Sequence, residues 1–404
     1  MTEAGQRAVE RLEALGRISD DPHFLLRTFL SPASRQAGDQ VMEWMRAIGM
    51  STDRARDGTL RGILPGSQPT ARPLLLGSHL DTVKDAGKYD GPLGILTALA
   101  ALETLGNQSL PFPVHLLAFS DEEGVRFHTT YLGSRSLAGP LDSETLAQRD
   151  ASGTTVAAAL AHEGFDDGVE ISYSSDSILG YVEAHIEQGR VLEEAGEALG
   201  VVSAIAGQSR LTLTLTGRTD HAGTTPMPLR RDALAAAAEC ILHIEAQARA
   251  HPPLVATVGT LHLHPSVSNS IPGFASLSLD FRHPDPVEHR LLLARLHDTL
   301  HEVASRRELT LNWSIVQENP PVPCDPLLTR HLAEAIEQEF GICRTLVSGA
   351  GHDGVAISAL GPIAMLMVRC RDGLSHHPDE FASPEDIEAT IRVLVRFLKS
   401  LANT

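Results

Sequence analysis

The spacing of hydrophobic residues changes repeatedly along the chain, and these changes predict an α/β protein. Short apolar runs at residues 74–78, 114–119 and 363–368 have the length of buried strands. In the segments between these runs, apolar residues recur three and four positions apart, which indicates helices. The expected helices cover residues 3–18, 32–50, 95–105 and 325–340, and a terminal helix begins with Ser383 as N-cap and Pro384 as its first residue.

Residues 206–318 follow a different pattern. Residues 211–216 alternate strictly between Leu and Thr, which predicts a strand with one buried face. A helix, two strands, a helix and a strand are expected next, and this β-α-β-β-α-β order is the split ferredoxin-like arrangement. The fold class is therefore α/β: residues 1–205 and 319–404 are expected to form one domain, with a smaller ferredoxin-like α+β domain, residues 206–318, inserted into it.

Charge and cysteine content exclude several classes of function. The 404-residue chain carries a formal net charge of -18, which would repel phosphate backbones, and no basic stripe supports binding to nucleic acid. No apolar run is long enough to span a membrane, and the N-terminal residues 1–19 read as an amphipathic helix instead of a signal peptide. The four cysteines are scattered without C-x-x-C spacing, so we expect reduced thiols in a cytoplasmic protein.

Imidazole and carboxylate groups follow two of the predicted strands. His79 and Asp81 end the first strand, Asp90 lies in the glycine-containing loop that follows, and Glu122 and Glu123 end the second strand. Open α/β sheets bind ligands at the carboxyl ends of their strands, so these side chains are expected to cluster. Each motif alone is more often a solvated surface feature. Together they offer the mixed nitrogen and oxygen ligands that suit Zn, Mn, Co or Ni.

His185 ends a further short apolar strand, in the run Tyr181-Val182-Glu183-Ala184-His185-Ile186. A lone histidine in such a strand is more often a core residue with satisfied hydrogen bonds. The site begun by the first two strands still needs ligands from elsewhere, and His185 is a candidate for that reason.

Taken in order, the motifs resemble the amidohydrolase/carbamoylase branch of the M20 metallopeptidase-like family. This branch contains allantoate amidohydrolases, N-carbamoyl-L-amino-acid hydrolases, β-ureidopropionases and ureidoglycolate amidohydrolases. The resemblance covers nearly the whole chain, and the motifs are specific only as a set. They are His79-x-Asp81, Tyr89-Asp90-Gly91-Pro92-Leu93-Gly94, Ser120-Asp121-Glu122-Glu123-Gly124, His185-Ile186-Glu187-Gln188-Gly189, His221-Ala222-Gly223-Thr224 and Gly373-Leu374-Ser375-His376.

The resemblance implies that residues 1–205 and 319–404 form a mixed-sheet catalytic domain and that the inserted residues 206–318 form a lid and dimerisation domain. It also implies two divalent metal ions per subunit, with Mn or Zn favoured and Co or Ni as alternatives. His79, Asp90 and His185 would hold one ion. Asp90, Glu123 and His376 would hold the other, so that Asp90 bridges the pair. His377 is the alternative to His376, because the two histidines are adjacent in the sequence.

The resemblance also implies catalytic roles. Asp81 would accept a hydrogen bond from the ring of His79 and fix its tautomer. Glu122 would be the general base, and we expect Glu123 to point elsewhere because successive residues of an extended chain face opposite ways. His221 from the lid of a partner subunit would donate to the oxyanion, which makes the expected enzyme a homodimer.

A small ureido or carbamoyl carboxylate is the expected substrate. Arg210 and Arg282 would bind its carboxylate, Asn269 and Gln188 would add neutral hydrogen bonds, and His352 would line the pocket near the oxyanion. The alternative for Arg282 is a surface ion pair worth about 0–1 kcal/mol. The match of residues 269–273 to the family favours the binding role.

Residues 365–373 resemble allantoate amidohydrolases more than carbamoylases, which favours conversion of allantoate to ureidoglycine, ammonia and carbon dioxide. N-carbamoyl-L-amino-acid hydrolase and β-ureidopropionase are the nearest alternatives. A dipeptidase of the same family is a further one, and the Glu187-Gln188-Gly189 run argues against it. A catalytically inactive binding protein is another, but such a protein has no physical reason to keep so many costly buried charges.

Overall fold

The computed structural model describes residues 1–106 and 108–403. The chain separates into two compact units. The first unit is Met1–Ser203 with Cys324–Thr404, and the second is Ala204–Pro323. The boundaries expected from the sequence follow residues 205 and 318.

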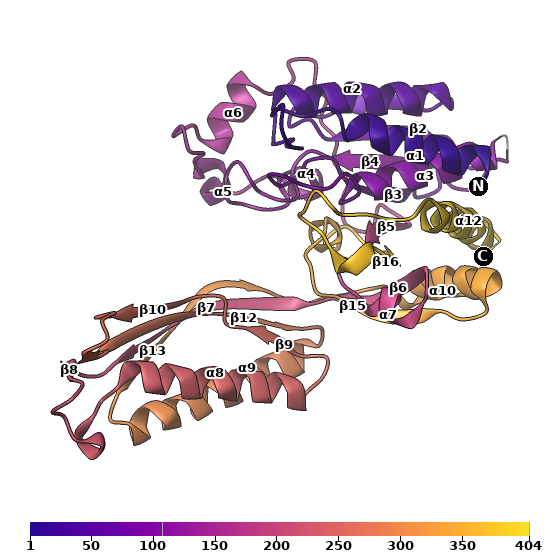
Figure 1. Cartoon of the computed structure of the whole chain (residues 1–404). Coiled ribbons are helices and arrows are strands. Elements are labelled where there is room, and N and C mark those ends of the chain that lie inside the picture. The colour runs from indigo at the N-terminus through magenta and orange to yellow at the C-terminus, as the bar shows by residue number, and fades with distance from the viewer. Residues whose placement is uncertain (107, 404) are drawn as a thin grey trace. The chain divides into compact units, whose positions relative to one another are not determined.

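A nine-stranded mixed sheet forms the centre of the first unit (Figure 1). Its strand order is β1-β2-β4-β3-β5-β16-β6-β14, and β15 pairs with β6. The strands are β1 Ser51–Arg54, β2 Leu60–Leu64, β3 Leu74–His79, β4 Val114–Phe119, β5 Gly180–Ile186, β6 Leu199–Ile205, β14 Val322–Pro323, β15 Arg344–Ser348 and β16 Ile363–Val368. The adjacent strands β4, β3, β5 and β16 are parallel, so their carboxyl ends meet at one edge of the sheet.

Helices pack on this sheet and on one another. The five long ones are α1 Glu3–Leu15, α2 Pro32–Ala47, α3 Pro92–Leu105, α10 Pro326–Phe340 and α12 Pro384–Leu401. The short ones are α4 Leu132–Ala138, α5 Ser143–Ala147, α6 Val156–His162, α7 Val191–Ala195 and α11 Gly354–Ile357. At the start of α12, the Ser383 side chain accepts a hydrogen bond from the Asp386 backbone N–H at 3.0 Å, and Pro384 is the first helical residue. This start is the one predicted from the sequence.

Two helix ends lie earlier than predicted, and a glycine lies at or just after each end. The first helix ends at Leu15 instead of residue 18, with Gly16 as its C-cap. The second ends at Ala47 instead of residue 50, and Gly49 follows with a φ of 86°. That left-handed conformation is easy for glycine and stops the helix.

The second unit is a five-stranded antiparallel sheet with helices α8 Ala233–Ala250 and α9 Pro286–Arg306 packed against it (Figure 1). Its strand order is β10-β12-β7-β13, and β9 pairs with β12. The strands are β7 Gly207–Thr216, β9 Val255–Thr257, β10 Leu261–His264, β12 Phe274–His283 and β13 Thr310–Asn319. This order is that of a ferredoxin-like fold, as predicted.

The first of the two strands expected between the helices of this unit is itself two strands, β9 and β10. β9 and β10 pair with different parts of β12, and residues 258–260 between them belong to neither strand. A separate two-stranded sheet joins β8, Asp220–His221, to β11, Ser270–Ile271. Among the described residues, no helix combines the length and apolarity required to cross a membrane.

The alternation that predicted β7 is visible in its burial. Leu211, Leu213 and Leu215 are almost completely buried and pack with apolar residues of α8 and α9, such as Ala237 and Leu296. The core of the first unit is also mainly aliphatic. Each unit therefore has its own hydrophobic core.

Candidate metal centre

The candidate ligands lie where the parallel strands end. His79 is the last residue of β3, His185 is next to last in β5, and Glu123 follows β4. His376 follows β16 after a short 3-10 turn, and Asp90 lies in the loop that leads into α3. Because β4, β3, β5 and β16 are neighbours in the sheet, residues far apart in the sequence reach the same edge.

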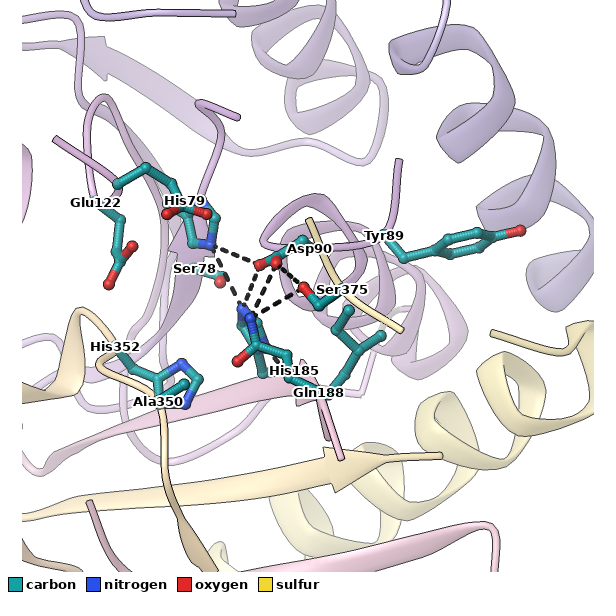
Figure 2. A network of polar contacts seen from close by, with 12 residues as sticks. Ser78, His79, Tyr89, Asp90, Glu122, His185, Gln188, Ala350, His352 and Ser375 are labelled. Atoms are coloured by element: carbon teal, nitrogen blue, oxygen red, sulfur yellow. Dashed lines mark hydrogen bonds and ion pairs between the residues drawn. The ribbon is translucent and has the colours of Figure 1, made fainter. Parts of the chain in front are cut away.

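Asp90 lies at the centre of this group, and Figure 2 shows it beside His79 and His185. Its Oδ1 is 3.3 Å from His79 Nε2 and 3.1 Å from His185 Nε2. Its Oδ2 is 3.4 Å from His376 Nε2, and that nitrogen is 3.2 Å from Glu123 Oε1. The two carboxylate oxygens of Asp90 thus face two different sets of ligand atoms, which is the geometry that a bridging carboxylate needs.

The donor set fits divalent cations. The ligand atoms of His79, Asp90 and His185 lie within 4.8 Å of one another, and so do those of Asp90, Glu123 and His376. The Nε2 atoms of His79 and His185 face each other at 3.4 Å. The Nδ1 of His185 is 2.9 Å from the Ile186 carbonyl oxygen, which places the proton on Nδ1 and the lone pair on Nε2. When both rings are neutral, their facing Nε2 atoms are both acceptors, and one cation would satisfy the two together.

Charge around Asp90 is consistent with this fit. Burial alone would raise the pKa of Asp90, but His185, His376 and His79 hold it well below its usual range. The carboxylate is therefore ionised and available as a ligand.

Asp81 contacts both sides of the site. His79 Nδ1 is 3.2 Å from the backbone oxygen of Asp81 and 3.4 Å from its Oδ1. The same carboxylate accepts hydrogen bonds from the backbone N–H groups of Glu122 at 2.9 Å and Glu123 at 3.2 Å. Asp81 thus links the end of β3 to the segment after β4, a contact that the sequence did not indicate.

We expected Glu123 to point away from Glu122 because the chain there would be extended, and that reason is wrong. The two residues lie in a bend, not in extended chain, so their side chains need not alternate. Both offer a carboxylate oxygen within 4.8 Å of each other and of a His79 ring nitrogen. Burial raises the pKa of Glu122 well above its usual range, with Glu123 and two further carboxylates adding to the effect against an opposing contribution from His79.

The structure places His376, and not His377, in the group around Asp90. The His377 ring instead approaches Asp379, at 3.7 Å, and its side chain is half exposed. His376 has a φ of 57° and Gln188 has a φ of 56°. Left-handed backbone is uncommon for residues other than glycine and often occurs at functional sites.

Gln188 and two further residues surround Asp90. Gln188 Nε2 donates to Asp90 Oδ2 at 2.9 Å and to Ser375 Oγ at 3.1 Å, and Ser375 Oγ donates to the same Asp90 oxygen. Glu380 Oε1 accepts from the backbone N–H groups of Tyr89, at 2.8 Å, and Asp90, at 3.0 Å. Sequence reasoning gave no role to Ser375 or Glu380, although both lie within or close to the run that contains His376.

His352 is buried beside the same group. Its ring meets that of His185 edge-on, with centroids 4.6 Å apart, and its Nε2 is 2.7 Å from Ser348 Oγ. Burial lowers the pKa of His352 well below its usual range, and the neighbouring His185 contributes to the shift. A neutral His352 next to the candidate ligands is compatible with the pocket-lining role expected for it.

The other expected substrate-binding residues belong to the second unit. Arg210 Nε is 3.1 Å from Asp280 Oδ2, and Arg282 Nε is 2.6 Å from Asp280 Oδ1. Burial of Asp280 alone would raise its pKa, but the two arginines hold it below its usual range. Arg282 thus forms an ion pair, the alternative considered from the sequence, and it shares this carboxylate with Arg210.

His221 and Asn269 lie together in the same unit. His221 is exposed and pairs with Ser270 in the two-stranded sheet, and the Ala222 N–H donates to the Asn269 carbonyl oxygen at 3.0 Å. The roles of Arg210, Arg282, His221 and Asn269 in binding stay predictions.

Comparison with known proteins identifies the family of this chain. The sequence pattern of peptidase family M20/M25/M40 matches residues 75–400. This chain belongs to that family. Allantoate deiminase 1 of Glycine max is 39% identical to it, with 98% of this chain and 89% of that protein aligned. The N-carbamoyl-L-amino acid amidohydrolase of Geobacillus stearothermophilus is 37% identical, with 98% of each chain aligned.

A crystal structure of a similar protein extends the comparison to the fold. An amidase of the hydantoinase/carbamoylase family from Burkholderia multivorans matches this M20-family protein with a TM-score of 0.91 at 31% identity, covering 99% of this chain and 98% of that one. The expected fold class, a mixed-sheet α/β domain with an inserted α+β domain, is confirmed.

Proposed function

We propose that this protein is a metal-dependent amidohydrolase that cleaves a linear C–N bond in a small ureido or carbamoyl carboxylate. Allantoate is the favoured substrate, with ureidoglycine, ammonia and carbon dioxide as products. The observation that carries the proposal is the position of Asp90, whose two oxygens face two separate sets of imidazole and carboxylate ligands. The similarity to allantoate deiminases and carbamoyl amino acid amidohydrolases supports the substrate class.

The ligand sets support two ions per subunit. His79, Asp90 and His185 would hold one, and Asp90, Glu123 and His376 would hold the other. Bound divalent ions would make a water molecule more acidic and polarise the carbonyl of the substrate. Mn or Zn is the favoured metal and Co or Ni the alternative, because imidazole and carboxylate ligands suit all four.

The remaining residues move protons and keep the ligands in place. Glu122 takes a proton from the attacking water and passes it to the departing nitrogen. Asp81 holds the proton of the His79 ring on Nδ1, so that Nε2 keeps its lone pair for the metal. Gln188 and Ser375 donate to Asp90 Oδ2, the oxygen that faces His376, and would keep the carboxylate in its bridging orientation.

Substrate recognition would use Arg210, Arg282 and Asn269, with Gln188 and His352 near the metal ligands. A guanidinium group matches a carboxylate through two parallel hydrogen bonds. Both arginines contact Asp280, so a substrate carboxylate would either replace Asp280 as their partner or bind to them alongside it.

A homodimer belongs to the proposal. The exposed His221 of the partner subunit would donate a hydrogen bond to the oxyanion of the substrate, as the family resemblance implies. A cytoplasmic location is also proposed, supported by the four free cysteines of the described chain, three of which are buried.

The direct test is a substrate panel assayed with Mn supplied. The panel contains allantoate, an N-carbamoyl-L-amino acid, N-carbamoyl-β-alanine, ureidoglycolate and a dipeptide. Release of ammonia is measured for the ureido and carbamoyl compounds, and release of free amino acid for the dipeptide. Preferred turnover of allantoate would support the proposal. Preferred turnover of the dipeptide, or no turnover of any compound by protein with its full metal content, would refute it.

Glu122→Gln tests the mechanism independently of the substrate. The variant should keep its metal content and lose most turnover, roughly 100-fold or more, because general-base catalysis is worth about 10²–10⁴-fold. The exposed Glu43→Gln is the matched control and should retain full activity. Near wild-type activity in Glu122→Gln would mean that another group acts as the base.

Mixing variants tests the dimer. His221→Ala should lower kcat with unchanged metal content, and a mixture with Glu122→Gln should recover part of the activity if each metal centre uses His221 of the partner subunit. A mixture as inactive as its two components would refute the shared site without affecting the assignment of the metal ligands.

N-carbamoyl-L-amino-acid hydrolysis is the second candidate function. Its support is the 37% identity to the Geobacillus stearothermophilus enzyme across 98% of both chains. The same panel separates the two functions, since each predicts a different preferred compound.

A further inference from the structure

The second unit contains a pair of histidines one helical turn apart, well separated in sequence from the candidate metal centre. His297 and His301 are both on α9, and positions four apart are neighbours on a helix surface. Their ring centroids are 4.0 Å apart with an angle of 36° between the ring planes. None of the groups of ligand atoms around Asp90 includes a residue of Ala204–Pro323.

Hydrogen bonds favour the same tautomer in both rings. His301 Nδ1 is 2.9 Å from the His297 carbonyl oxygen, and His297 Nδ1 is 3.2 Å from Asp298 Oδ1. An oxygen next to Nδ1 places the proton there and leaves the lone pair on Nε2, which is how metal-binding histidines are usually oriented. Within residues 1–106 and 108–403, no hydrogen bond uses Nε2 of either ring.

The pair is open to solvent. The His297 side chain is 43% exposed and His301 is half-buried. Leu296 and Leu300 occupy the buried face of α9, so both histidines lie beside that face instead of within the core. An ion could therefore reach the pair without unfolding of the helix.

We propose that His297 and His301 bind one divalent transition-metal ion through their Nε2 atoms, with water completing its coordination. Imidazole suits Cu²⁺, Ni²⁺ and Zn²⁺, with Cu²⁺ the tightest, whereas Mn²⁺ prefers oxygen ligands. Two histidines four residues apart on a helix are also the pair used in helical zinc sites. The protein would then bind one more ion of this class than its candidate metal centre requires.

Trp313 provides a local signal for this ion. Its ring meets the His297 ring edge-on, with centroids 5.2 Å apart. The chain has two tryptophans, and the other, Trp44, lies in α2 of the first unit. In the Trp44→Phe variant, all tryptophan fluorescence comes from Trp313, so a paramagnetic Cu²⁺ bound at the pair would quench it.

The experiment is a Cu²⁺ titration of full-length Trp44→Phe protein that has first been saturated with Mn²⁺. A saturable loss of Trp313 fluorescence is expected. The loss should be reversed by excess Zn²⁺, which competes without quenching, and should be absent when Mn²⁺ alone is added. His297→Gln and His301→Gln should each remove the saturable quenching.

The matched control is His243→Gln, an exposed histidine on α8 with no histidine one turn away, which should quench as before. Circular dichroism would establish that each variant is folded. If either His297→Gln or His301→Gln fails to fold, the other variant still tests the proposal. Asp298→Asn is a further test and should weaken Cu²⁺ binding, because it alters the carboxylate next to His297 Nδ1. Quenching that survives in a folded His297→Gln or His301→Gln variant, or no saturable quenching in a large excess of Cu²⁺, would overturn the proposal.

Discussion

Replacing Arg27 with Met should destabilise the first unit by about 3 kcal/mol. The Arg27 side chain is fully buried and donates to three backbone carbonyl oxygens: those of Leu80 at 2.9 Å, Leu15 at 2.8 Å and Ile18 at 3.1 Å. The Leu15 oxygen also accepts from the Ile18 N–H. Within the described chain, the Leu80 and Ile18 oxygens accept hydrogen bonds from Arg27 alone.

The magnitude follows from these two oxygens. Each buried acceptor that loses its partner costs about 1–3 kcal/mol, so the two together cost roughly 2–6 kcal/mol. Removal of the buried charge offsets part of this cost. Burial lowers the pKa of Arg27 to about 10, which still leaves it charged at neutral pH, with Asp81 and Asp20 nearby as opposite charges.

Urea unfolding measures the change. In a Trp313→Phe background, fluorescence reports on Trp44 and therefore on the first unit alone. With an m-value of about 2 kcal/mol/M, the midpoint should fall by roughly 1.5 M. Arg392→Met removes a half-exposed arginine paired with Glu339 and should cost no more than about 1 kcal/mol.

Metal retention is a second measurement on the same variant. Because Leu80 lies between His79 and Asp81, loss of its hydrogen bond should also weaken metal binding. If Arg27→Met shifts the midpoint no further than Arg392→Met, the buried arginine is not supporting the end of β3, and the reasoning is refuted.

Three further predictions concern the first unit. If each chain holds the two proposed ions, Asp90→Asn should reduce the metal content to less than one ion per chain, measured by elemental analysis after dialysis, and should lower activity by at least about 100-fold in the substrate assay. The exposed Asp39→Asn should change neither. Burial, aided by Arg61, lowers the pKa of His115 to about 4. Its stabilising contribution is therefore complete above its unfolded pKa of about 6.5 and is lost as the pH falls through 4. His115→Gln should make the melting temperature depend less on pH between these two values, and an unchanged dependence would contradict the prediction. Gly94→Ala should cost about 1–3 kcal/mol because its Cβ would lie 2.2 Å from the Ala184 carbonyl oxygen, whereas Gly139→Ala, with open space around it, should be nearly neutral in thermal melts.

Much of the fold could be predicted because the spacing of hydrophobic residues and the capping residues indicate the same helix and strand boundaries at many places. The strands β4 and β16 have the predicted bounds, since their apolar runs begin and end at clear changes in polarity. The short edge strand β1 was missed because Ser51–Arg54 is mostly polar, and its pairing with β2 is set by tertiary contacts.

The residues that cluster around Asp90 could be predicted from the sequence, but not the residues that support them. Local motifs identified His79, Asp90 and His376 as candidates. The role of Glu380 depends on a contact with a backbone N–H 290 positions away, and Arg27 acts on a carbonyl 53 positions away. Sequence spacing carries no signal for such contacts, because only the folded sheet brings these segments together.

The wide spacing of the ligands along the chain has a consequence for biosynthesis. Ser375, which hydrogen-bonds to Asp90, follows it by 285 positions, and His376 is the next residue. A ribosome must therefore complete most of the polypeptide before the ligand set proposed for a second ion is present. Capture of that ion would then occur as a last maturation step, and a prematurely terminated chain would fail it however well its earlier strands had assembled.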